Sequence, residues 1–319
     1  MGVLPESVLK ILDPGGPTMR IGYAVDLHGW ATPPRRTGWD DVRTLTLTAE
    51  SIGFDLVVVP DHTLYSRETG SVGCWESVAT AGALAAVTST VRLGHSMFNG
   101  PYRPPTLVAK AAETLDEITG GRYVLGIGAG NTEDYDAVGV AGDRRYSRFA
   151  EAIEIIHRLL KDGAVDLRGE HWRAEKAEMV MRGPRPTGPP VVVAAWGPRM
   201  MALAARFADE WNACTPGGFD AERLRSMSRA FDLVCEASGR DPASLTRSAD
   251  VVLDPLGLAP EGGDLLCGSH REMADGILGV GESAGMDEVR CYLVSDETPD
   301  GRRRALDAMA EVVGLVHAA

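Results

Sequence analysis

Strand-like and helix-like segments alternate along this chain of 319 residues, and that alternation limits the possible folds more than any other feature. Short β-branched runs such as 55–60 are each followed by a stretch with apolar residues at helical spacing. The expected strands are residues 20–25, 55–60, 91–95, 123–128, 190–195, 210–213, 245–253 and 288–295. The expected helices are residues 39–52, 75–88, 104–118, 147–160, 199–208, 221–238, 269–284 and 301–317.

Eight strand-plus-helix units predict an α/β protein with a single (β/α)8 TIM barrel. The alternative is a doubly wound open sheet, which would normally place a glycine fingerprint after the first strand; none follows Val25. We expect a proline-rich N-terminal extension over residues 1–18 and the barrel over 19–319. A small hairpin is expected over 165–172, and an insertion loop rich in Gly and Pro after strand seven, over 254–268.

Charge and cysteine usage narrow the class of protein. The 32 Lys and Arg against 45 Asp and Glu give a net charge of −13, which argues against nucleic acid and anionic membranes as partners. We find no apolar run of about 18 residues and no secretory signal, so a cytoplasmic enzyme is expected. The five cysteines are scattered without a CxxC pair, which predicts reduced thiols and no metal site.

Polar side chains gather where the expected strands end. In a barrel the carboxyl ends of the strands carry the chemistry, so these residues are the candidates for the site. A lone histidine is more often a satisfied structural residue, but three of the seven histidines lie in these loops. The candidates are Asp26, His28, Asp61, His62, Ser96, Met97, Asn99, Gly130, Asn131, Asp134 and the turn from Ala195 to Arg199.

The turn after strand five has features of a phosphate site. The turn reads Ala195-Trp196-Gly197-Pro198-Arg199. Gly197 lets a ligand approach the backbone. Pro198 can begin a helix because the first helical residue needs no backbone N–H for a hydrogen bond within the helix. The free N–H groups, the helix dipole and Arg199 would favour an anion. An ordinary strand-to-helix connection remains the alternative.

The glycines at 126, 128 and 130 have the spacing of part of a dinucleotide-binding loop. No helix begins directly after them, and the fourth strand is the wrong place for such a loop. Glycines at the end of a barrel strand more simply make room for a flat ring across the barrel mouth.

Several segments together resemble the bacterial luciferase-like superfamily of oxidoreductases. The resemblance covers about residues 20–296, almost the whole chain. It rests on Ala49-Glu-Ser-Ile-Gly-Phe-Asp-Leu-Val-Val-Val-Pro-Asp-His62, on Arg-Leu-Gly-His-Ser-Met-Phe-Asn over 92–99, and on Leu-Gly-Ile-Gly-Ala-Gly over 125–130. Further support comes from Thr-Leu-Asp-Glu-Ile-Thr-Gly-Gly-Arg over 114–122, from Trp-Gly-Pro with Ala-Asp-Glu-Trp over 196–211, and from residues 268–276.

This resemblance implies one of two cofactors, FMN or the deazaflavin coenzyme F-420 (F420 in the names of enzymes). The pair Asp61 and His62 resembles the coenzyme F-420 branch, in which the ring lies in the barrel mouth and a non-prolyl cis peptide supports it; the matching bond here is Ser96–Met97. The implied cofactor contacts are Asp61, His62, Ser96, Met97, Asn99, Gly130, Asp134, Ala195, Trp196, Gly197, Pro198 and Arg199. His62 and Asn131 are the implied catalytic residues, and Asp26, His28 and Trp75 are assigned to the substrate pocket.

One position departs from the pattern of the sugar-phosphate dehydrogenases in that branch. They carry a Glu proton donor where this chain has Asn131, and an amide cannot give up a proton at useful cost. Glu133 or Asp134 are possible substitutes. Because the 254–268 loop also lacks a basic cluster for a substrate phosphate, a neutral substrate with a C=C or C=N bond is favoured.

The leading hypothesis is therefore hydride transfer between coenzyme F-420 and a small organic molecule. The alternative is an FMN-dependent monooxygenase that uses reduced FMN and O2, and a third is a binding protein that has lost its cofactor. A homodimer is expected from the resemblance alone. Either cofactor is an anion, so a net-negative chain needs local donors, with Gly197 and Arg199 first and Arg103 next.

Overall fold

The computed structural model describes residues 19–30, 37–62, 64–67, 70–130, 135, 138–213, 220–259 and 264–319, with backbone alone for 28–30, 64–67 and 70–72. Within them, eight parallel strands close into a barrel, since β8 pairs with β11 and β1 pairs with β15. The strands are β1 (Arg20–Ala24), β3 (Leu56–Val59), β6 (Arg92–His95), β8 (Tyr123–Gly128), β11 (Val191–Ala194), β12 (Glu210–Ala213), β13 (Thr246–Asp254) and β15 (Glu288–Leu293).

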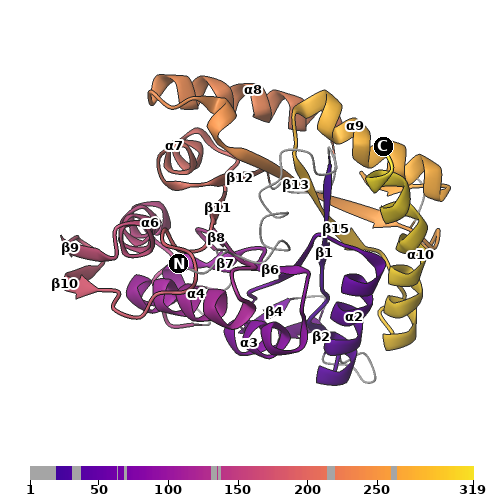
Figure 1. The fold of residues 1–319 in the computed structure, drawn as a ribbon, viewed down its shortest axis with the longest axis horizontal. Helices are drawn as coiled ribbons and strands as arrows, with labels where there is room; N and C mark the ends of the chain where they lie inside the picture. The colour runs from indigo at the N-terminus through magenta and orange to yellow at the C-terminus, as the bar shows by residue number, and fades with distance from the viewer. Residues whose placement is uncertain are drawn as a thin grey trace, which may run out of the picture.

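Eight α-helices of the described chain surround these strands (Figure 1). They are α2 (Trp39–Ile52), α3 (Ser77–Val87), α4 (Pro105–Thr119), α6 (Arg145–Lys161), α7 (Pro198–Phe207), α8 (Ala221–Ala237), α9 (His270–Ala284) and α10 (Pro299–His317). The predicted barrel is confirmed, and each predicted strand and helix has a counterpart within about two residues at either end. The apolar core fills the layer between the strands and the helices.

Local chemistry explains where the helices begin and end. Ser269 and Glu272 form a capping box at the start of α9, as the sequence predicted. Gly53 ends α2 in the left-handed conformation at φ 101°, which a residue with a side chain rarely adopts. The predicted start of the third helix at residue 75 was too early: Glu76 is the N-cap and accepts a hydrogen bond from the backbone N–H of Ala79.

The predicted hairpin is confirmed, and it is longer than the sequence indicated. Its antiparallel strands are β9 (Ala164–Arg168) and β10 (Arg173–Glu178), so residues 169–172 form the turn. The carboxylate of Glu151 accepts hydrogen bonds from the backbone N–H groups of three of these residues at 2.8–2.9 Å. A side chain on α6 therefore fixes this turn, which local spacing could not indicate.

Additional short elements decorate the barrel. β2 (His28–Trp30), β4 (Leu64–Arg67) and β5 (Gly70–Cys74) form an antiparallel sheet that the sequence did not predict. β7 (Phe98–Asn99) pairs with β8, and two 3-10 turns, η2 (Gly100–Tyr102) and η3 (Pro242–Ser244), follow β7 and α8. Within the expected loop 254–268, β14 (Leu266–Cys267) pairs with β13; residues 1–18 and 260–263 lie outside the described chain.

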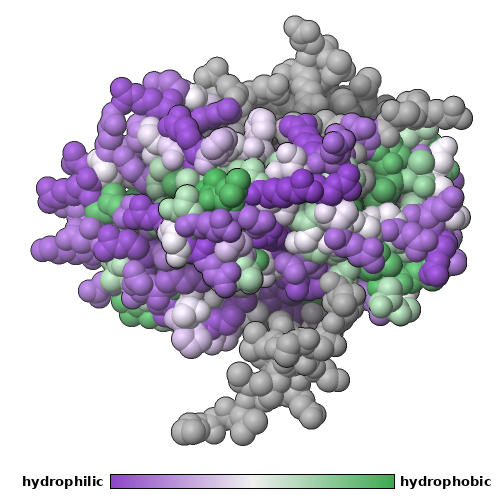
Figure 2. Space-filling model, turned by 90° about the horizontal axis from the view of Figure 1, so that it is seen from above, coloured by the Kyte–Doolittle hydropathy of each residue, from purple (hydrophilic) through white to green (hydrophobic). Residues whose placement is uncertain are grey.

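The face drawn in Figure 2 is mainly hydrophilic where its residues are described. Figure 2 shows a face on which hydrophobic residues form separate small groups among polar ones. None of the described helices combines the length and the apolar composition that a membrane crossing requires.

Candidate active site

A cavity of about 940 Å³ opens at the carboxyl ends of the barrel strands. Its size falls in the range of small-molecule and cofactor sites. Nine of the predicted site residues line it, namely Asp61, His62, Ser96, Met97, Asn99, Gly130, Trp196, Gly197 and Arg199. Gly128, one of the glycines expected to make room for a flat ring, lines it as well. The sequence did not single out the other lining residues, which are Ala129, Arg145, Tyr146, Ala194, Met200, Asp250 and Tyr292.

Asp61 follows β3 and is almost fully buried, with 2% of its surface exposed. Its Oδ2 accepts from Arg103 Nη1 and from the Asn99 N–H, both at 2.8 Å. Its Oδ1 accepts from Ser77 Oγ at 2.6 Å and from Arg103 Nη2 at 3.0 Å. Burial alone would raise the pKa of Asp61, but these donors and the Arg103 charge lower it below its usual value. Asp61 is thus an ionised anchor with both oxygens engaged.

This anchor holds the segment that follows β6. Asn99 is tied to Asp61 twice, because its side-chain amide also donates to the Asp61 carbonyl. The Ser96–Met97 peptide bond is cis, as the resemblance implied. At Gly126 an added Cβ would lie 1.9 Å from the His95 carbonyl oxygen and 3.0 Å from Met97 Sδ. The glycine on β8 therefore makes room for the bulge that carries Ser96 and Met97 into the cavity.

His62 comes directly after the anchor and lines the cavity, half-buried. Because Asp61 is clamped by Arg103, Ser77 and Asn99, the backbone that carries His62 is fixed at the strand end. An imidazole held there can exchange a proton with a bound molecule or stabilise charge that develops on it.

The strand-five turn also reaches the cavity. Trp196, Gly197 and Arg199 line it, and Gly197 is the N-cap of α7 without a side-chain cap. The Arg199 guanidinium lies 3.8 Å from the centre of the Tyr146 ring, and Arg145 stands beside Tyr146 at the start of α6. Two helix N-termini and two arginines thus make this part of the cavity favourable for an anion.

Two members of the predicted turn do not line the cavity. Ala195 is fully buried in the core, and its carbonyl accepts a hydrogen bond from Trp211 Nε1 at 2.7 Å. Its neighbour Ala194 lines the cavity instead, because successive residues of a strand face opposite sides. Pro198 is the first residue of α7 and contributes no lining atom.

Two of the three residues assigned to the substrate pocket do not line this cavity. Asp26 accepts from Arg302 Nε at 2.7 Å, and Trp75 donates through Nε1 to the Thr37 carbonyl at 2.7 Å; neither lines the cavity. Of His28 only the backbone is described. Asn131, Glu133 and Asp134 lie outside the described residues.

Arg103 was predicted to donate hydrogen bonds to an anionic cofactor, but its guanidinium binds other side chains of the protein. Besides Asp61 it binds Glu76 at 2.9 Å, and its guanidinium lies 4.5 Å from the centre of the Phe98 ring. We therefore assign it to the support of Asp61 and the bulge.

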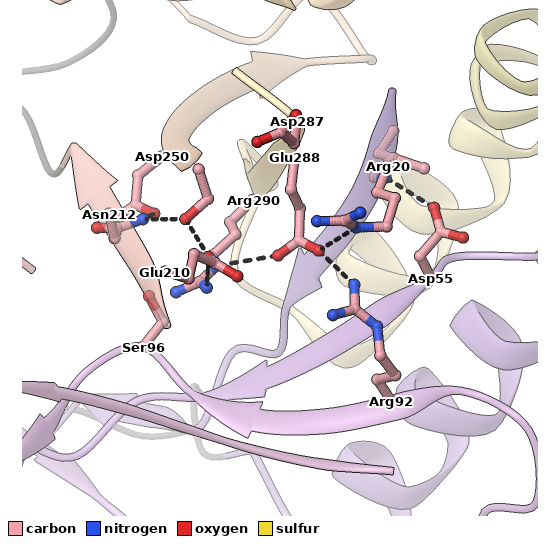
Figure 3. A network of polar contacts seen from close by, with 12 residues as sticks. Arg20, Asp55, Arg92, Ser96, Glu210, Asn212, Asp250, Asp287, Glu288 and Arg290 are labelled. Atoms are coloured by element: carbon pink, nitrogen blue, oxygen red, sulfur yellow. Dashed lines mark hydrogen bonds and ion pairs between the residues drawn. The ribbon is translucent and has the colours of Figure 1, made fainter. Parts of the chain in front are cut away.

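A network of buried charges fills the barrel beneath the cavity (Figure 3). Glu288 accepts from Arg20, Arg92 and Arg290, and Arg290 also donates to Glu210 at 2.7 Å. Arg20 and Arg92 lie at one end of the network, and Asn212 and Asp250 at the other (Figure 3). Asp250 brings this network to the cavity wall. Ser248 and Asp250 are two residues apart on β13, so their side chains lie on the same face of the strand, and in the closed barrel this face points inward.

The donor set suits an organic cofactor better than a metal. In the described part of the chain no group of three His, Cys, Asp or Glu side chains is placed to hold a metal ion. The cavity instead offers a bulge, a glycine-rich strand end and an anion-friendly turn, which match the flat ring and acidic arm of a flavin-like molecule.

Comparison with known proteins identifies the family. The family model described as luciferase-like monooxygenase matches residues 19–253. The chain belongs to this family.

Similar proteins from the family include enzymes named for coenzyme F420 chemistry. The chain is 34% identical over 205 residues to a 5,10-methylenetetrahydromethanopterin reductase of Archaeoglobus fulgidus, covering 60% of this chain and 57% of the reductase. It is 32% identical over 232 residues to an F420-dependent glucose-6-phosphate dehydrogenase of Intrasporangium calvum, covering 70% and 68%. The chain thus spans less than two thirds of the length of the first relative.

Solved structures share the fold of this family member. An F420-dependent secondary alcohol dehydrogenase in complex with an F420-acetone adduct superposes with a TM-score of 0.75 at 19% identity, covering 93% of this chain and 98% of that one. A long-chain alkane monooxygenase superposes with a TM-score of 0.74 at 16% identity, covering 94% and 91%. Both comparisons show that the chain has the barrel fold. The chemistry has to be argued from the residues of the cavity.

Proposed function

We propose that this protein is an oxidoreductase that transfers a hydride between coenzyme F-420 and a small organic substrate. The observation that carries the proposal is the arrangement of Asp61, His62 and the Ser96–Met97 bulge around one cavity. Relatives named as an F420-dependent dehydrogenase and a methylenetetrahydromethanopterin reductase support it.

The cavity residues divide into those that would hold the cofactor and those that would act on the substrate. The Ser96–Met97 bulge and the Gly128 and Gly130 strand end would support the ring, and the Gly197 turn with Arg199 would take the acidic arm. When bound, the deazaflavin supplies a hydride donor or acceptor. Trp196, 56% exposed at the cavity, would shield the site from water.

For the substrate we propose a neutral molecule in which a C=N or C=C bond is reduced. The described acids of the cavity are Asp61 and Asp250. Asp61 already binds Arg103, Ser77 and Asn99, so it is not placed to recognise a cationic group. Asn131, outside the described residues, still supplies no acid in place of Glu.

Titration of the purified protein with coenzyme F-420 and with FMN tests the proposal. Trp196 lines the cavity, so quenching of tryptophan fluorescence reports binding, and a Trp196→Phe variant identifies its share of the signal. We expect saturable quenching by coenzyme F-420 at micromolar levels and none by FMN. Binding of FMN alone would support the flavin-dependent monooxygenase instead, and binding of neither would support a barrel without a cofactor.

The homodimer remains a prediction, and light scattering of the purified protein measures it directly.

A further inference from the structure

Burying the polar network beneath the cavity costs free energy, and the barrel fold by itself does not require these charged residues. Glu288, Arg290, Asn212 and Ser248 have no exposed surface, and each buried charge loses its hydration. The bonds within the network satisfy Glu288, Glu210 and Arg290, whereas its last member, Asp250, reaches the cavity. The network thus ends in a carboxyl group facing any bound molecule.

A chain of hydrogen bonds links that carboxyl to a second one. Ser248 Oγ donates to Glu210 Oε1 at 2.5 Å. Asn212 Nδ2 donates to Ser248 Oγ and to Asp250 Oδ1, both at 3.1 Å. In this polarity Asp250 and Glu210 both accept, which suits two ionised carboxylates.

Asn212 also permits the opposite polarity. Its Oδ1 is buried and has no hydrogen-bond partner among the described residues. A turn of the amide by 180° would exchange Oδ1 and Nδ2, whose positions differ little in shape. Oδ1 would then accept from a protonated Asp250 and from Ser248, while Ser248 would accept from a protonated Glu210.

The charges around this chain of hydrogen bonds are compatible with both the ionised and the protonated state of the two carboxyl groups. Burial and the nearby Glu288 raise the pKa of Glu210, against the effect of Arg290. Among the described residues, the groups near Asp250 include Arg290 and Tyr292 from β15 and Asn212 from β12. Asp250 also acts electrostatically on the buried Cys291 thiol. Since Arg290 is shared with Glu210 and Glu288, it does not bind Asp250 exclusively.

We propose that Asp250 is the acid–base residue of this cavity, which gives or takes the proton that accompanies hydride transfer, and that Asn212 serves both of its protonation states. This inference rests on the proposed function. It also supplies an acid that the residue at Asn131 lacks. Tyr292, whose hydroxyl donates to Ser96 Oγ at 3.3 Å, borders the same wall of the cavity.

The step balances for a C=N substrate. Reduced deazaflavin, when bound, would supply a hydride from its C–H bond to the carbon atom, and the π electrons of the C=N bond would move to nitrogen. The nitrogen would take the proton of the Asp250 carboxyl, so a C–H and an N–H bond form while the C=N π bond, the ring C–H bond and the O–H bond break. Loss of the hydride oxidises the ring, which would then release its N–H proton to solvent, and solvent would return one proton to the Asp250 carboxylate.

Proton uptake on cofactor binding tests the proposal without a substrate. Isothermal titration with reduced coenzyme F-420, under anaerobic conditions in phosphate and in Tris at pH 7, gives the protons taken up from the difference in heats. Because a ligand that displaces water favours the neutral carboxyl, the wild type should take up more protons than Asp250→Asn. The control Asp307→Asn makes the same charge change on an exposed position of α10 and should match the wild type.

Turnover provides the second measurement. With 2-methyl-1-pyrroline and 2-cyclohexen-1-one as probes, Asp250→Asn should lower kcat by about 100-fold and remove the fall in rate at high pH, since general acid catalysis has that magnitude. Its Kd for coenzyme F-420 should stay within about threefold of the wild type, which shows a folded site; Asp250→Glu should recover part of the rate.

The outcomes separate the two proposals. Equal proton uptake and equal kcat in the wild type and Asp250→Asn would overturn the role of Asp250 alone. A wild type that binds coenzyme F-420 but reduces neither probe would also overturn it. Failure of the wild type to bind coenzyme F-420 would overturn the proposed function, together with the inference that rests on it.

Discussion

The guanidinium of Arg103 holds both carboxylate oxygens of Asp61, through Nη1 to Oδ2 at 2.8 Å and Nη2 to Oδ1 at 3.0 Å. Asp61 in turn fixes Asn99 at the end of the cis bulge and carries His62 as its neighbour. Asp61 therefore acts as a positioning residue for the cavity wall. Both of its carboxylate oxygens already accept hydrogen bonds from within the protein.

Replacing Asp61 with Asn should destabilise the protein and weaken cofactor binding together. The change removes the negative charge beside Arg103 and replaces one of the two acceptor oxygens with an N–H donor, so either Ser77 or Asn99 loses its acceptor. We expect a loss of about 2–4 kcal/mol in the free energy of unfolding. Urea unfolding and coenzyme F-420 titration measure the two effects. Asp307→Asn should change stability by less than about 0.5 kcal/mol. An Asp61→Asn protein as stable as the wild type would contradict the positioning role.

Acid should remove the same contribution. The folded-state pKa of Asp61 lies below its usual value, so its stabilisation is fully present above the unfolded pKa of about 3.9 and is lost as pH falls through the lower folded value. Urea unfolding at pH 7, 5, 4 and 3 should show wild-type stability falling over the acidic part of this range. In Asp61→Asn the fall should be shallower, and parallel curves would exclude Asp61 as a source of the acid sensitivity.

His62 should affect turnover more than binding. Its ring lines the cavity beside a fixed backbone, so it can stabilise charge that develops on a bound molecule. We expect His62→Asn to lower kcat by about 100-fold at saturating cofactor, the usual size of such an electrostatic contribution. His270→Asn is the matched control, because His270 pairs with Glu311 on the helical surface. Unchanged turnover in His62→Asn would remove it from the chemistry.

The alternation of strands and helices was enough to predict the barrel, because each unit has its own local signal. The alternation also allowed nine of the cavity residues to be predicted. The carboxyl ends of barrel strands meet at one end of the barrel, even when the strands are far apart in the sequence. Asp26 and Trp75 were assigned to the substrate pocket, but neither lines this cavity. Their partners, Arg302 and Thr37, are 276 and 38 residues away, and no local pattern reveals such pairing.

Asp250 was missed for a different reason. Both faces of a barrel strand are covered, so period-two spacing on β13 or β15 predicts a strand without telling which face points inward. Charged residues such as Glu288 and Arg290 look like a solvated face in sequence, yet they are fully buried. The compensating charges come from β1, β6 and β12, which only the closed barrel brings together.

The two glycines of β8 should respond differently to a methyl group. In Gly126→Ala the new Cβ would meet the His95 carbonyl at 1.9 Å, so backbone must shift, and we expect a loss of at least about 2 kcal/mol with weaker cofactor binding. In Gly128→Ala the nearest atom would be Met97 Cβ at 3.7 Å, an ordinary contact, and stability should change by less than about 1 kcal/mol. Thermal unfolding of the two variants measures the difference in stability. A loss in Gly126→Ala as small as that in Gly128→Ala would show that the bulge can shift at little cost.

Arg199 and Arg145 should govern how an acidic cofactor enters a protein of net charge −13. Each Arg→Gln change should weaken coenzyme F-420 binding about three- to tenfold at low salt. The deazaflavin riboside, which lacks phosphate and glutamates, should bind all variants alike. Arg303→Gln, an exposed cation on α10, is the control.

Salt separates the local cations from the global charge. Added salt screens the repulsion between the acidic protein and the anionic cofactor, which tightens binding, and it also screens the attraction of Arg145 and Arg199, which weakens binding. In the double Gln variant only the repulsion remains, so its Kd should fall with salt more steeply than that of the wild type. Titrations between 20 mM and 500 mM NaCl measure both slopes. Equal slopes would mean that these arginines contribute no charge to the site.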